Sequence, residues 1–275
     1  MDALRSPIIA HLEERRQAVS TAELALEAEP IDSGWMAWAG PGSWANQACG
    51  LGLGGPVSDG DLDRLVDFYL ARGAEPRLEV CAYAHPSLLE GLARRGFVLR
   101  EFESVLARAA PVDLDPAALL VHGWPEGLQL VEVDPGDAEA VKTFIDVSTS
   151  GFRPAGEPIT EVFFNTTLKM VEHPRCDSVL ALVDGEVVGG AAMESAGEVG
   201  CLFGASVLPD FRRRGIQAAL IAWRLCRGAR RGCRWIAIHA APGLPTERNA
   251  LRLGFFLAYT KVVMTLPRPD LTPST

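Results

Sequence analysis

The chain has 275 residues and a formal net charge of −9 at pH 7. Nucleic-acid-binding proteins usually carry a basic surface, so this acidic balance argues against that class. No apolar run approaches the roughly 20 residues that a membrane-spanning helix needs, and the first residues lack the basic-then-apolar order of a signal peptide. We therefore expect a cytoplasmic protein that binds neither nucleic acid nor a membrane.

Apolar spacing predicts an alternation of helices and strands in the first part of the chain. In chain order, the predicted elements are an amphipathic helix over 5–27, two strands joined by a turn at 41–43, a helix that starts near residue 58, a strand over 77–84, a helix over 86–96 and a strand over 97–108. Residues 109–126 are rich in proline and alanine, which predicts a linker.

After this linker the pattern starts again. The predicted elements are a strand over 128–135, helices over 137–152 and 156–173, a hairpin over 178–195, a strand over 198–209, a helix over 215–232, a strand over 235–242, a short helix over 245–254 and a strand over 255–266. The Asp-Gly pair at 184–185, between two apolar runs, is a strong signal for the hairpin turn.

The two parts of the chain end alike. LARRGFVLREFESVLAR (92–108) and NALRLGFFLAYTKVVMTL (249–266) each contain a short helix that ends in Arg-x-Gly-Phe and runs into a strand. We infer a tandem repeat of one α/β domain, with a first domain at 1–110, a linker at 111–126 and a second domain at 127–275.

The six cysteines show neither CxxC spacing nor clustering with histidine, and most lie in apolar runs. This pattern predicts buried free thiols and no metal site. The sequence also contains no G-K-[ST] phosphate loop, no HExxH and no GxSxG, so hydrolase and kinase functions have no support from motifs.

The stretch VLPDFRRRGIQAALIAW (207–223) joins a strand end to a helix through three arginines and a glycine. The first N–H groups of a helix have no intrahelical partner, and the helix dipole adds positive charge there. Arginines beside such an end strengthen anion binding through charge-assisted hydrogen bonds. This predicts a pyrophosphate site; a solvated basic turn is the alternative. Its residues would be Arg212, Arg213, Arg214, Gly215, Ile216, Gln217 and Ala218.

LPDFRRRGIQAALI resembles motif A of the GNAT superfamily of N-acetyltransferases, whose pattern is Arg/Gln-x-x-Gly-x-Gly/Ala. Arg212 and Gly215 fall on this pattern, and Gln217 stands where Gly or Ala is usual. The resemblance implies that this loop binds the pyrophosphate of acetyl-CoA. The stretch PTERNALRLGF looks like motif B of the same family, which implies that Asn249 lies beside the CoA arm.

The resemblance also implies a fold. We expect an α/β (α+β) protein of two GNAT-like domains in tandem, each a mixed, mostly antiparallel central sheet flanked by helices. In the second domain a splayed strand pair would bind CoA, whose pantetheine arm would pair with the backbone of Ala205, Ser206 and Val207. In the first domain GLGLGG (50–55) occupies the place of RRRGIQ and acidic residues follow it, which predicts a degenerate copy; a nucleotide site is the alternative.

Acetyl transfer to an amine requires loss of a proton from the amine and protonation of the leaving thiolate. The resemblance implies a carboxylate base on the fourth strand, for which Glu198 is the candidate; a solvated carboxylate is the alternative. The motif B position that often carries tyrosine is Ala250, so Tyr259 is the candidate acid, and an aromatic residue in a half-buried strand is its alternative. Direct attack, with solvent protonating the thiolate, needs neither residue.

The hypothesis is an acetyl-CoA-dependent N-acetyltransferase that acts on a primary amine of a small molecule. Its rivals are a non-catalytic acyl-CoA-binding or regulatory protein and an N-acyltransferase acting on a protein terminus. Five residues of 137–172 are expected to line the acceptor pocket, and the single arginine among them suggests an acceptor that bears a carboxylate. They are Phe152, Arg153, Glu157, Phe163 and Phe164. Because a fused repeat supplies its own domain interface, we expect a monomer.

Overall fold

The computed structural model describes residues 5–112, 114–154 and 157–271. The chain forms two compact units. Unit 1 comprises Met1–Val105 and Leu257–Thr275, and unit 2 comprises Leu106–Phe256. The boundary therefore falls within the strand that leaves unit 1 and at the start of the strand that returns to it.

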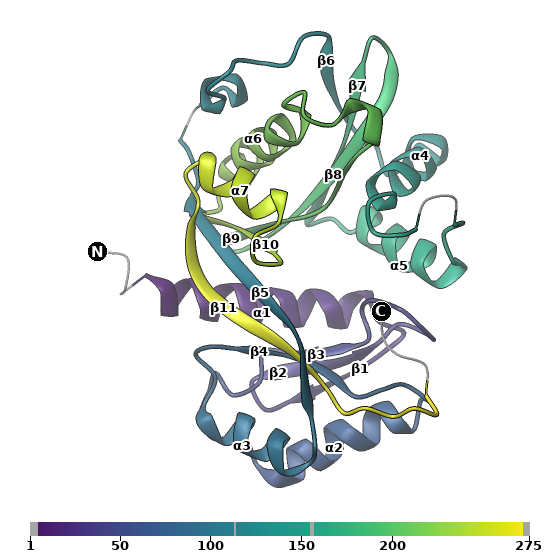
Figure 1. Cartoon of the computed structure of the whole chain (residues 1–275), viewed down its shortest axis with the longest axis vertical. Coiled ribbons are helices and arrows are strands. Elements are labelled where there is room, and N and C mark those ends of the chain that lie inside the picture. The colour runs from purple at the N-terminus through teal and green to yellow at the C-terminus, as the bar shows by residue number, and fades with distance from the viewer. Residues whose placement is uncertain (1–4, 113, 155–156, 272–275) are drawn as a thin grey trace. The chain divides into compact units, whose positions relative to one another are not determined.

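Unit 1 is a mixed sheet with helices (Figure 1). Its strands follow the order β1-β2-β3-β4-β11-β5, in which β3 and β4 are parallel while β1–β2, β2–β3 and β4–β11 are antiparallel. The elements are α1 (Ser6–Leu24), β1 (Glu27–Ile31), β2 (Gly34–Trp38), β3 (Gln47–Cys49), α2 (Asp59–Leu70), β4 (Arg77–Cys81), α3 (Pro86–Arg94), β5 (Val98–Ala109) and β11 (Phe256–Thr265).

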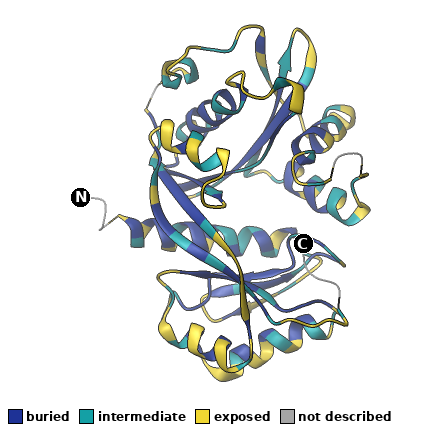
Figure 2. Ribbon diagram, viewed as in Figure 1, coloured by how far each residue is buried: buried dark blue, intermediate teal, exposed yellow. Residues whose placement is uncertain are grey.

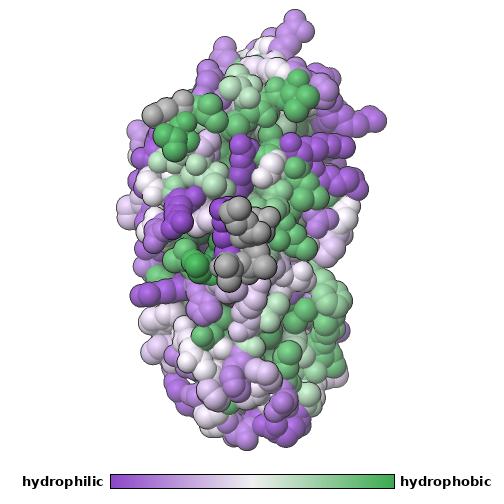
Figure 3. All heavy atoms as spheres, turned by 90° about the vertical axis from the view of Figure 1, so that its left-hand side faces the viewer, coloured by the Kyte–Doolittle hydropathy of each residue, from purple (hydrophilic) through white to green (hydrophobic). Residues whose placement is uncertain are grey.

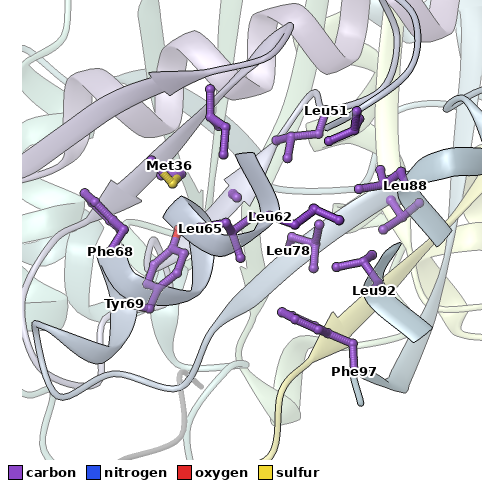
Figure 4. Packing of buried hydrophobic residues seen from close by; sticks show 14 of the residues in the cluster. Met36, Leu51, Leu62, Leu65, Phe68, Tyr69, Leu78, Leu88, Leu92 and Phe97 are labelled. Atoms are coloured by element: carbon purple, nitrogen blue, oxygen red, sulfur yellow. The ribbon is translucent and has the colours of Figure 1, made fainter. Parts of the chain in front are cut away.

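The apolar core of unit 1 lies between the sheet and helices α2 and α3 (Figure 4). Leu62 and Leu65 of α2, Leu88 and Leu92 of α3 and Leu78 of β4 are at most 1% exposed. Spacings of three and four residues place each leucine pair on one helix face, and burying each side chain contributes about 1.5–3 kcal/mol. The opposite faces of these helices are largely exposed (Figure 2).

Helix α1 buries charged side chains, which differs from the amphipathic pattern expected from its sequence. Ile8 is 60% exposed, whereas Glu13 and Glu14 are fully buried. Both carboxylates have partners: Arg16 donates to Glu13 at 2.6 Å and 2.9 Å, and the Tyr259 hydroxyl donates to Glu14 at 2.8 Å. Buried carboxylates are tolerated because these donors replace the hydrogen bonds of water.

Lys261 of β11 lies at the centre of this buried network. Its Nζ is 2.5 Å from Glu79, 3.6 Å from Glu14 and 3.5 Å from Glu103, and it donates to the Gln17 side-chain oxygen at 2.5 Å. The Lys261 side chain is fully buried. Burial by itself lowers the pKa of Lys261, but the three carboxylates outweigh it, and the pKa lies well above 10.5.

In unit 2 the strands follow the order β10-β9-β8-β7-β6 after the end of β5. β9 and β10 are parallel, and the pairs β6–β7, β7–β8 and β8–β9 are antiparallel. The elements are a 3₁₀ turn (Pro116–Leu119), β6 (Leu128–Glu132), α4 (Ala138–Thr149), α5 (Glu161–Glu172), β7 (Cys176–Val183), β8 (Glu186–Ala196), β9 (Val199–Val207), a 3₁₀ turn (Pro209–Phe211), α6 (Ile216–Arg230), β10 (Trp235–Ala240) and α7 (Pro245–Arg252).

The structure confirms the predicted order of helices and strands, including the hairpin that turns at 184–185. β1 was not predicted, because the predicted first helix extends to residue 27 whereas α1 ends at Leu24. β1 contains Pro30, which breaks the strand pattern in the sequence. It is tolerated because β1 is an edge strand, where the missing N–H removes no ladder hydrogen bond.

The final strand of each sequence repeat lies wholly or partly in the other compact unit. β11, at the end of the second repeat, pairs with β4 of unit 1, as in Val262↔Val80. The end of β5, from Leu106 onward, belongs to unit 2, where Ala110 N donates to Arg234 O at 3.0 Å. The compact units therefore differ from 1–110 and 127–275, and these ranges stay a prediction about the sequence repeats.

Among the described residues, none of the helices combines the length and apolar character that crossing a membrane requires. The face drawn in Figure 3 mixes hydrophobic and hydrophilic residues. All six cysteines are free thiols, and all except the half-buried Cys176 are buried, as the sequence predicted.

Candidate functional site

The turn between β9 and α6 exposes three arginines and a glycine. Residues 212–215 form this arginine turn. All four are exposed, and α6 begins directly after them at Ile216. Gly215 has a φ of +82° and Arg213 a φ of +63°, so the chain reverses sharply before the helix. The first N–H groups of the 15-residue helix α6 therefore open onto a basic turn, which is the arrangement that binds anions.

Two of the arginines also fix the shape of the turn. Arg212 Nε donates to the carbonyl of Val207, the last residue of β9, at 3.0 Å. The guanidinium of Arg214 lies 4.9 Å from the centre of the Phe211 ring, within the range of a cation–π contact. Both side chains use only part of their hydrogen-bonding capacity in these contacts, because a guanidinium has five N–H donors.

Strands β9 and β10 pair over four residues and then stop pairing. The parallel register runs from Val199↔Trp235 to Leu202↔Ile238, and β9 then continues to Val207. This agrees with the splayed strand pair that the sequence predicted. Beyond Leu202 this edge of β9 offers backbone groups to an extended partner other than β10.

A bulge in β9 coincides with the end of this pairing. Across β8 and β9 the partners are Ala192↔Phe203 and then Gly190↔Ser206, so three steps of β9 oppose two steps of β8. Gly204, inside the bulge, has a φ of +53°, a conformation that glycine adopts without a steric penalty. Bulges of this kind redirect side chains and often lie next to active sites.

The predicted motif residues Gln217 and Asn249 lie together. Asn249 Nδ2 donates to Gln217 Oε1 at 2.5 Å, and Gln217 Nε2 donates to Thr246 Oγ1 at 3.2 Å. The side chain of Gln217 is therefore engaged with α7. Thr246 was not predicted, because a threonine in the first turn of a short helix carries no sequence signal beyond that of a helix start.

Glu198, the predicted base, lies far from the arginine turn. It directly precedes β9, whereas the turn follows Val207 at the other end of the strand. At roughly 3.3 Å per residue, the nine intervening steps span about 30 Å. The carboxylate is 60% exposed and lies 3.7 Å from Arg234. The role of Glu198 as the base that deprotonates the acceptor amine therefore stays a prediction.

Tyr259, the predicted acid, belongs to unit 1 and is 4% exposed. Its hydroxyl donates to Glu14. Burial raises the pKa of Tyr259 well above 10, and the negative charges of Glu14 and Glu13 raise it further. These contacts tie Tyr259 into the buried network of unit 1 and give no support to a catalytic role.

The segment between α4 and α5 carries three of the five predicted acceptor residues. Phe152 is 62% exposed. Arg153 forms an ion pair with Asp146 of α4 and donates to the carbonyl of Glu157 at 2.7 Å. The positive charge of Arg153 is therefore engaged within the chain, which removes the basis for expecting a carboxylate on the acceptor.

The same segment is attached to β9. Ser150 Oγ lies 3.0 Å from Ser206 Oγ, close to the bulge. The remaining predicted acceptor residues, Phe163 and Phe164, are half-buried on α5, where Phe164 packs against the apolar cluster of α4. The structure thus joins the end of α4 to the bulge, and an acceptor pocket lined by the five residues stays a prediction.

The glycine-rich loop of unit 1 follows a parallel strand pair, as the arginine turn does in unit 2. The pairing of β3 with β4 is Ala48↔Leu78. In this loop Gly52 N donates to the carboxylate of Asp32 at 2.6 Å, and Gly52 O accepts from His85 N at 2.8 Å. The Gly52 N–H is thus already bonded to Asp32 of the same unit. The bond from His85 N to Gly52 O joins the segment after β4 to the segment after β3.

One buried cation near the bulge was missed by the sequence analysis. Arg224 is 1% exposed and donates to the carbonyls of Ala192 and Phe203 at 2.9 Å and 3.1 Å. The signal was present: Arg224 follows Ile216 and Leu220 at intervals of four, on the stripe of α6 that faces the sheet. Because arginine side chains are usually exposed to solvent, Arg224 was not predicted to belong to the buried face of this helix.

Residues 143–255 match the model of the Acetyltransferase (GNAT) family. A GCN5-related N-acetyltransferase from Kribbella flavida is similar in structure, with a TM-score of 0.64 and 19% identity over 93% of this chain and 96% of that one. A second, from Sphaerobacter thermophilus, has a TM-score of 0.57 and 20% identity over 82% and 74%.

A tandem GNAT protein from the clavulanic acid biosynthesis pathway is also similar, with a TM-score of 0.51 and 17% identity over 69% of this chain and 63% of that one. No curated protein matches the sequence. At these identities the structural likeness shows the fold, while the family match covers the arginine turn, the diverging strands and α7. The chain therefore carries an acetyltransferase domain of the GNAT family within unit 2.

Proposed function

We propose that unit 2 is an acetyl-CoA-dependent N-acetyltransferase that transfers an acetyl group to a primary amine of a small molecule. The observation that carries the proposal is the exposed arginine–glycine turn at the N-terminus of α6, directly after a strand that diverges from its parallel neighbour. A pyrophosphate suits the turn because its negative charge complements both the arginines and the helix dipole.

The residues present fit the pyrophosphate and the pantetheine arm of acetyl-CoA. The backbone N–H groups of Ile216, Gln217 and Ala218, with the three arginines before them, would bind the pyrophosphate. The free edge of β9 at residues 205–207 would pair with the amides of the pantetheine arm. Bound acetyl-CoA supplies the acetyl group as a thioester. Asn249, held by Gln217, would lie beside the arm.

The reaction forms a bond between the amine nitrogen and the thioester carbon and breaks the carbon–sulfur bond. The amine loses a proton, and the CoA thiolate gains one. Backbone N–H groups at the β9 bulge would stabilise the negative charge that develops on the carbonyl oxygen. Since Glu198 is exposed beside Arg234 and the Tyr259 hydroxyl donates to Glu14, we propose direct attack by the neutral amine, with solvent accepting and returning the protons.

The test is an assay of CoA release from acetyl-CoA with a panel of primary amines that includes phenethylamine, spermidine and glycinamide. Release of CoA with acetylation of an amine, confirmed by product mass, is the expected result. Binding of acetyl-CoA without release across the panel would favour a non-catalytic acyl-CoA-binding protein. A product that carries a longer acyl group, or acetylation only of a peptide terminus, would favour the other rival.

We also propose that acetyl-CoA binds only to unit 2. In unit 1 the carboxylate of Asp32 already accepts from Gly52 N. The first turn of α2 adds Asp59 and Asp61, of which Asp59 pairs with Arg94 and Arg95. The negative charges of these carboxylates repel a pyrophosphate. Asp59 and Asp61 stand at the place in unit 1 that corresponds to the arginines in unit 2.

The expected stoichiometry in a calorimetric titration is therefore one acetyl-CoA per chain. The physical reason is that the donor at Gly52 is satisfied internally, so binding there would require displacing a charge-assisted hydrogen bond, at a cost of about 1.5–3 kcal/mol. A fitted stoichiometry of two would show that unit 1 keeps a cofactor site.

Three further features stay predictions of this proposal. The acceptor is expected to be a small amine without a required carboxylate, because Arg153 is paired with Asp146. The compartment is expected to be the cytoplasm and the state in solution a monomer. Size-exclusion chromatography with light scattering would test the last of these.

A further inference from the structure

Arg224 is buried beneath the sheet of unit 2 without a counter-ion. It projects from α6, which lies alongside β8 and β9 (Figure 1), and is among the largest fully buried side chains. Its guanidinium donates to three carbonyls, those of Leu220, Ala192 and Phe203. Within the described residues Nη2 has no hydrogen-bond partner, and no carboxylate forms an ion pair with this side chain.

This arrangement is costly for stability. Burial lowers the pKa of Arg224 to about 9, so the side chain is still a cation at neutral pH. A buried charge without a counter-ion destabilises a fold, and an apolar side chain of similar volume is often better tolerated at such a position. Stability alone therefore gives no reason for an arginine here.

The contact with Phe203 connects Arg224 to the diverging edge of β9. Alternate residues of a strand direct their backbone groups to the same neighbour. Because Glu198 O accepts from Trp235 N at 3.0 Å, Glu198 and the residues two and four positions later face β10. Gly204 lies in the bulge, two positions beyond Leu202, the last residue paired with β10. The guanidinium that binds Phe203 O also binds Ala192 O, which places it on the β8 side of β9.

Phe203 O and Gly204 N belong to one peptide bond, and that bond is trans. In a trans peptide the C=O and N–H point in opposite directions. Arg224 therefore binds the oxygen on the β8 side of this peptide, while the N–H points to the β10 side, where the strands separate. A cation on the oxygen polarises the peptide and strengthens its N–H as a donor.

We propose that Arg224 is a positioning residue for acetyl transfer, which polarises the Phe203–Gly204 peptide so that Gly204 N–H stabilises the oxyanion of the thioester. The inference rests on the proposed function, since it requires that the acetyl group enters between β9 and β10. As the amine attacks, the carbonyl oxygen gains negative charge, and the polarised N–H binds that charge more strongly than the neutral thioester.

The test is infrared spectroscopy of acetyl-CoA labelled with ¹³C at the thioester carbonyl, which needs no acceptor amine. In the wild-type protein the carbonyl stretch of bound acetyl-CoA is expected to move to lower frequency. In Arg224→Met most of that shift is expected to be lost, while the dissociation constant for acetyl-CoA stays within about twofold, because the arginine turn supplies most of the affinity. With an amine from the panel, kcat is expected to fall about tenfold or more.

Arg227→Met is the matched control. Arg227 lies one turn further along α6 and pairs with Asp177, which keeps Arg231 as a partner at 2.7 Å. This variant is expected to keep the wild-type infrared shift. Arg224→Gln serves as a second variant if Arg224→Met does not fold: it keeps an amide donor without the charge and is expected to lose most of the shift.

The inference would be overturned if the carbonyl stretch shifted in folded Arg224→Met as much as in the wild type. If Arg224→Met does not fold, the same result in Arg224→Gln would overturn it. An equal loss in Arg227→Met would also overturn it, because the effect would then reflect a general change in the helix. Failure of the wild-type protein to bind acetyl-CoA would contradict the proposed function itself, and calorimetry distinguishes that result before the spectra are recorded.

Discussion

Gly215→Glu is expected to weaken acetyl-CoA binding by about 100-fold or more, since the loss of two charge-assisted hydrogen bonds at about 1.5–3 kcal/mol each corresponds to that factor. The new carboxylate would enter the basic turn and compete with the pyrophosphate for Arg212 and its neighbours. The backbone adds a further cost, because Gly215 has a φ of +82° and a Cβ there would lie 3.4 Å from Pro125. Isothermal titration calorimetry measures the effect.

Gly232→Glu is the matched control for this variant. Gly232 has the same φ of +82° and follows the C-terminal end of α6, and no described atom lies within 4 Å of the position of its Cβ. It introduces the same charge and the same backbone penalty away from the turn, so it is expected to bind acetyl-CoA as the wild type does. Equal weakening in both variants would show that strain or net charge, and not the arginine turn, controls binding.

Lys261→Met is expected to lower the free energy of unfolding by about 3–5 kcal/mol, which is the usual effect of removing one partner from a buried ion pair. The variant leaves Glu14 and Glu79 buried without the ammonium that neutralises them. Because β11 comes from the end of the chain, it is also expected to pair less stably with β4. Urea denaturation followed by circular dichroism measures the loss.

Lys142→Met is the control, because Lys142 is exposed on α4 and surface substitutions usually change stability by about 0.5 kcal/mol or less. Adding Glu79→Gln to Lys261→Met is expected to recover part of the loss, since it removes one of the unpaired charges. If Lys261→Met proved as stable as Lys142→Met, the buried network would contribute nothing to the stability of unit 1.

The stabilisation by Lys261 is expected to be independent of pH between pH 6 and pH 9. The pKa of Lys261 is raised above 10.5 in the folded protein, so its contribution is complete below 10.5 and is lost only as the pH rises through the higher folded value. The difference in unfolding free energy between wild type and Lys261→Met should therefore stay constant across this range. A decrease that begins below pH 9 would mean that the three carboxylates do not hold the charge.

The basic turn before α6 could be predicted from the local sequence alone. A strand end, three arginines, a glycine and a helix start are contiguous, so their order alone places the N–H groups of α6 beside the charges of Arg212–Arg214. The structure keeps that arrangement and adds the contact of Gln217 with Asn249, two residues that the motifs had indicated separately.

The catalytic predictions depended on contacts between distant segments and received no such support. Glu198 was predicted from its residue type on the expected strand; it directly precedes β9 and is 60% exposed beside Arg234, which adds no support for its role as the base. Asp32 and Arg224 were not singled out, because a charged residue is normally assigned to solvent and its burial depends on partners elsewhere in the chain.

The sequence by itself determined the helices and strands other than β1 and the basic turn before α6, because apolar periodicity, turn residues and helix termini act over a few neighbouring residues. Only the tertiary structure decided that β11 pairs with β4, that Lys261 is buried among carboxylates and that Arg224 lies behind the bulge. The physical reason is that strand partners and buried charge pairs are selected by long-range packing, for which the pattern of a single segment allows several solutions.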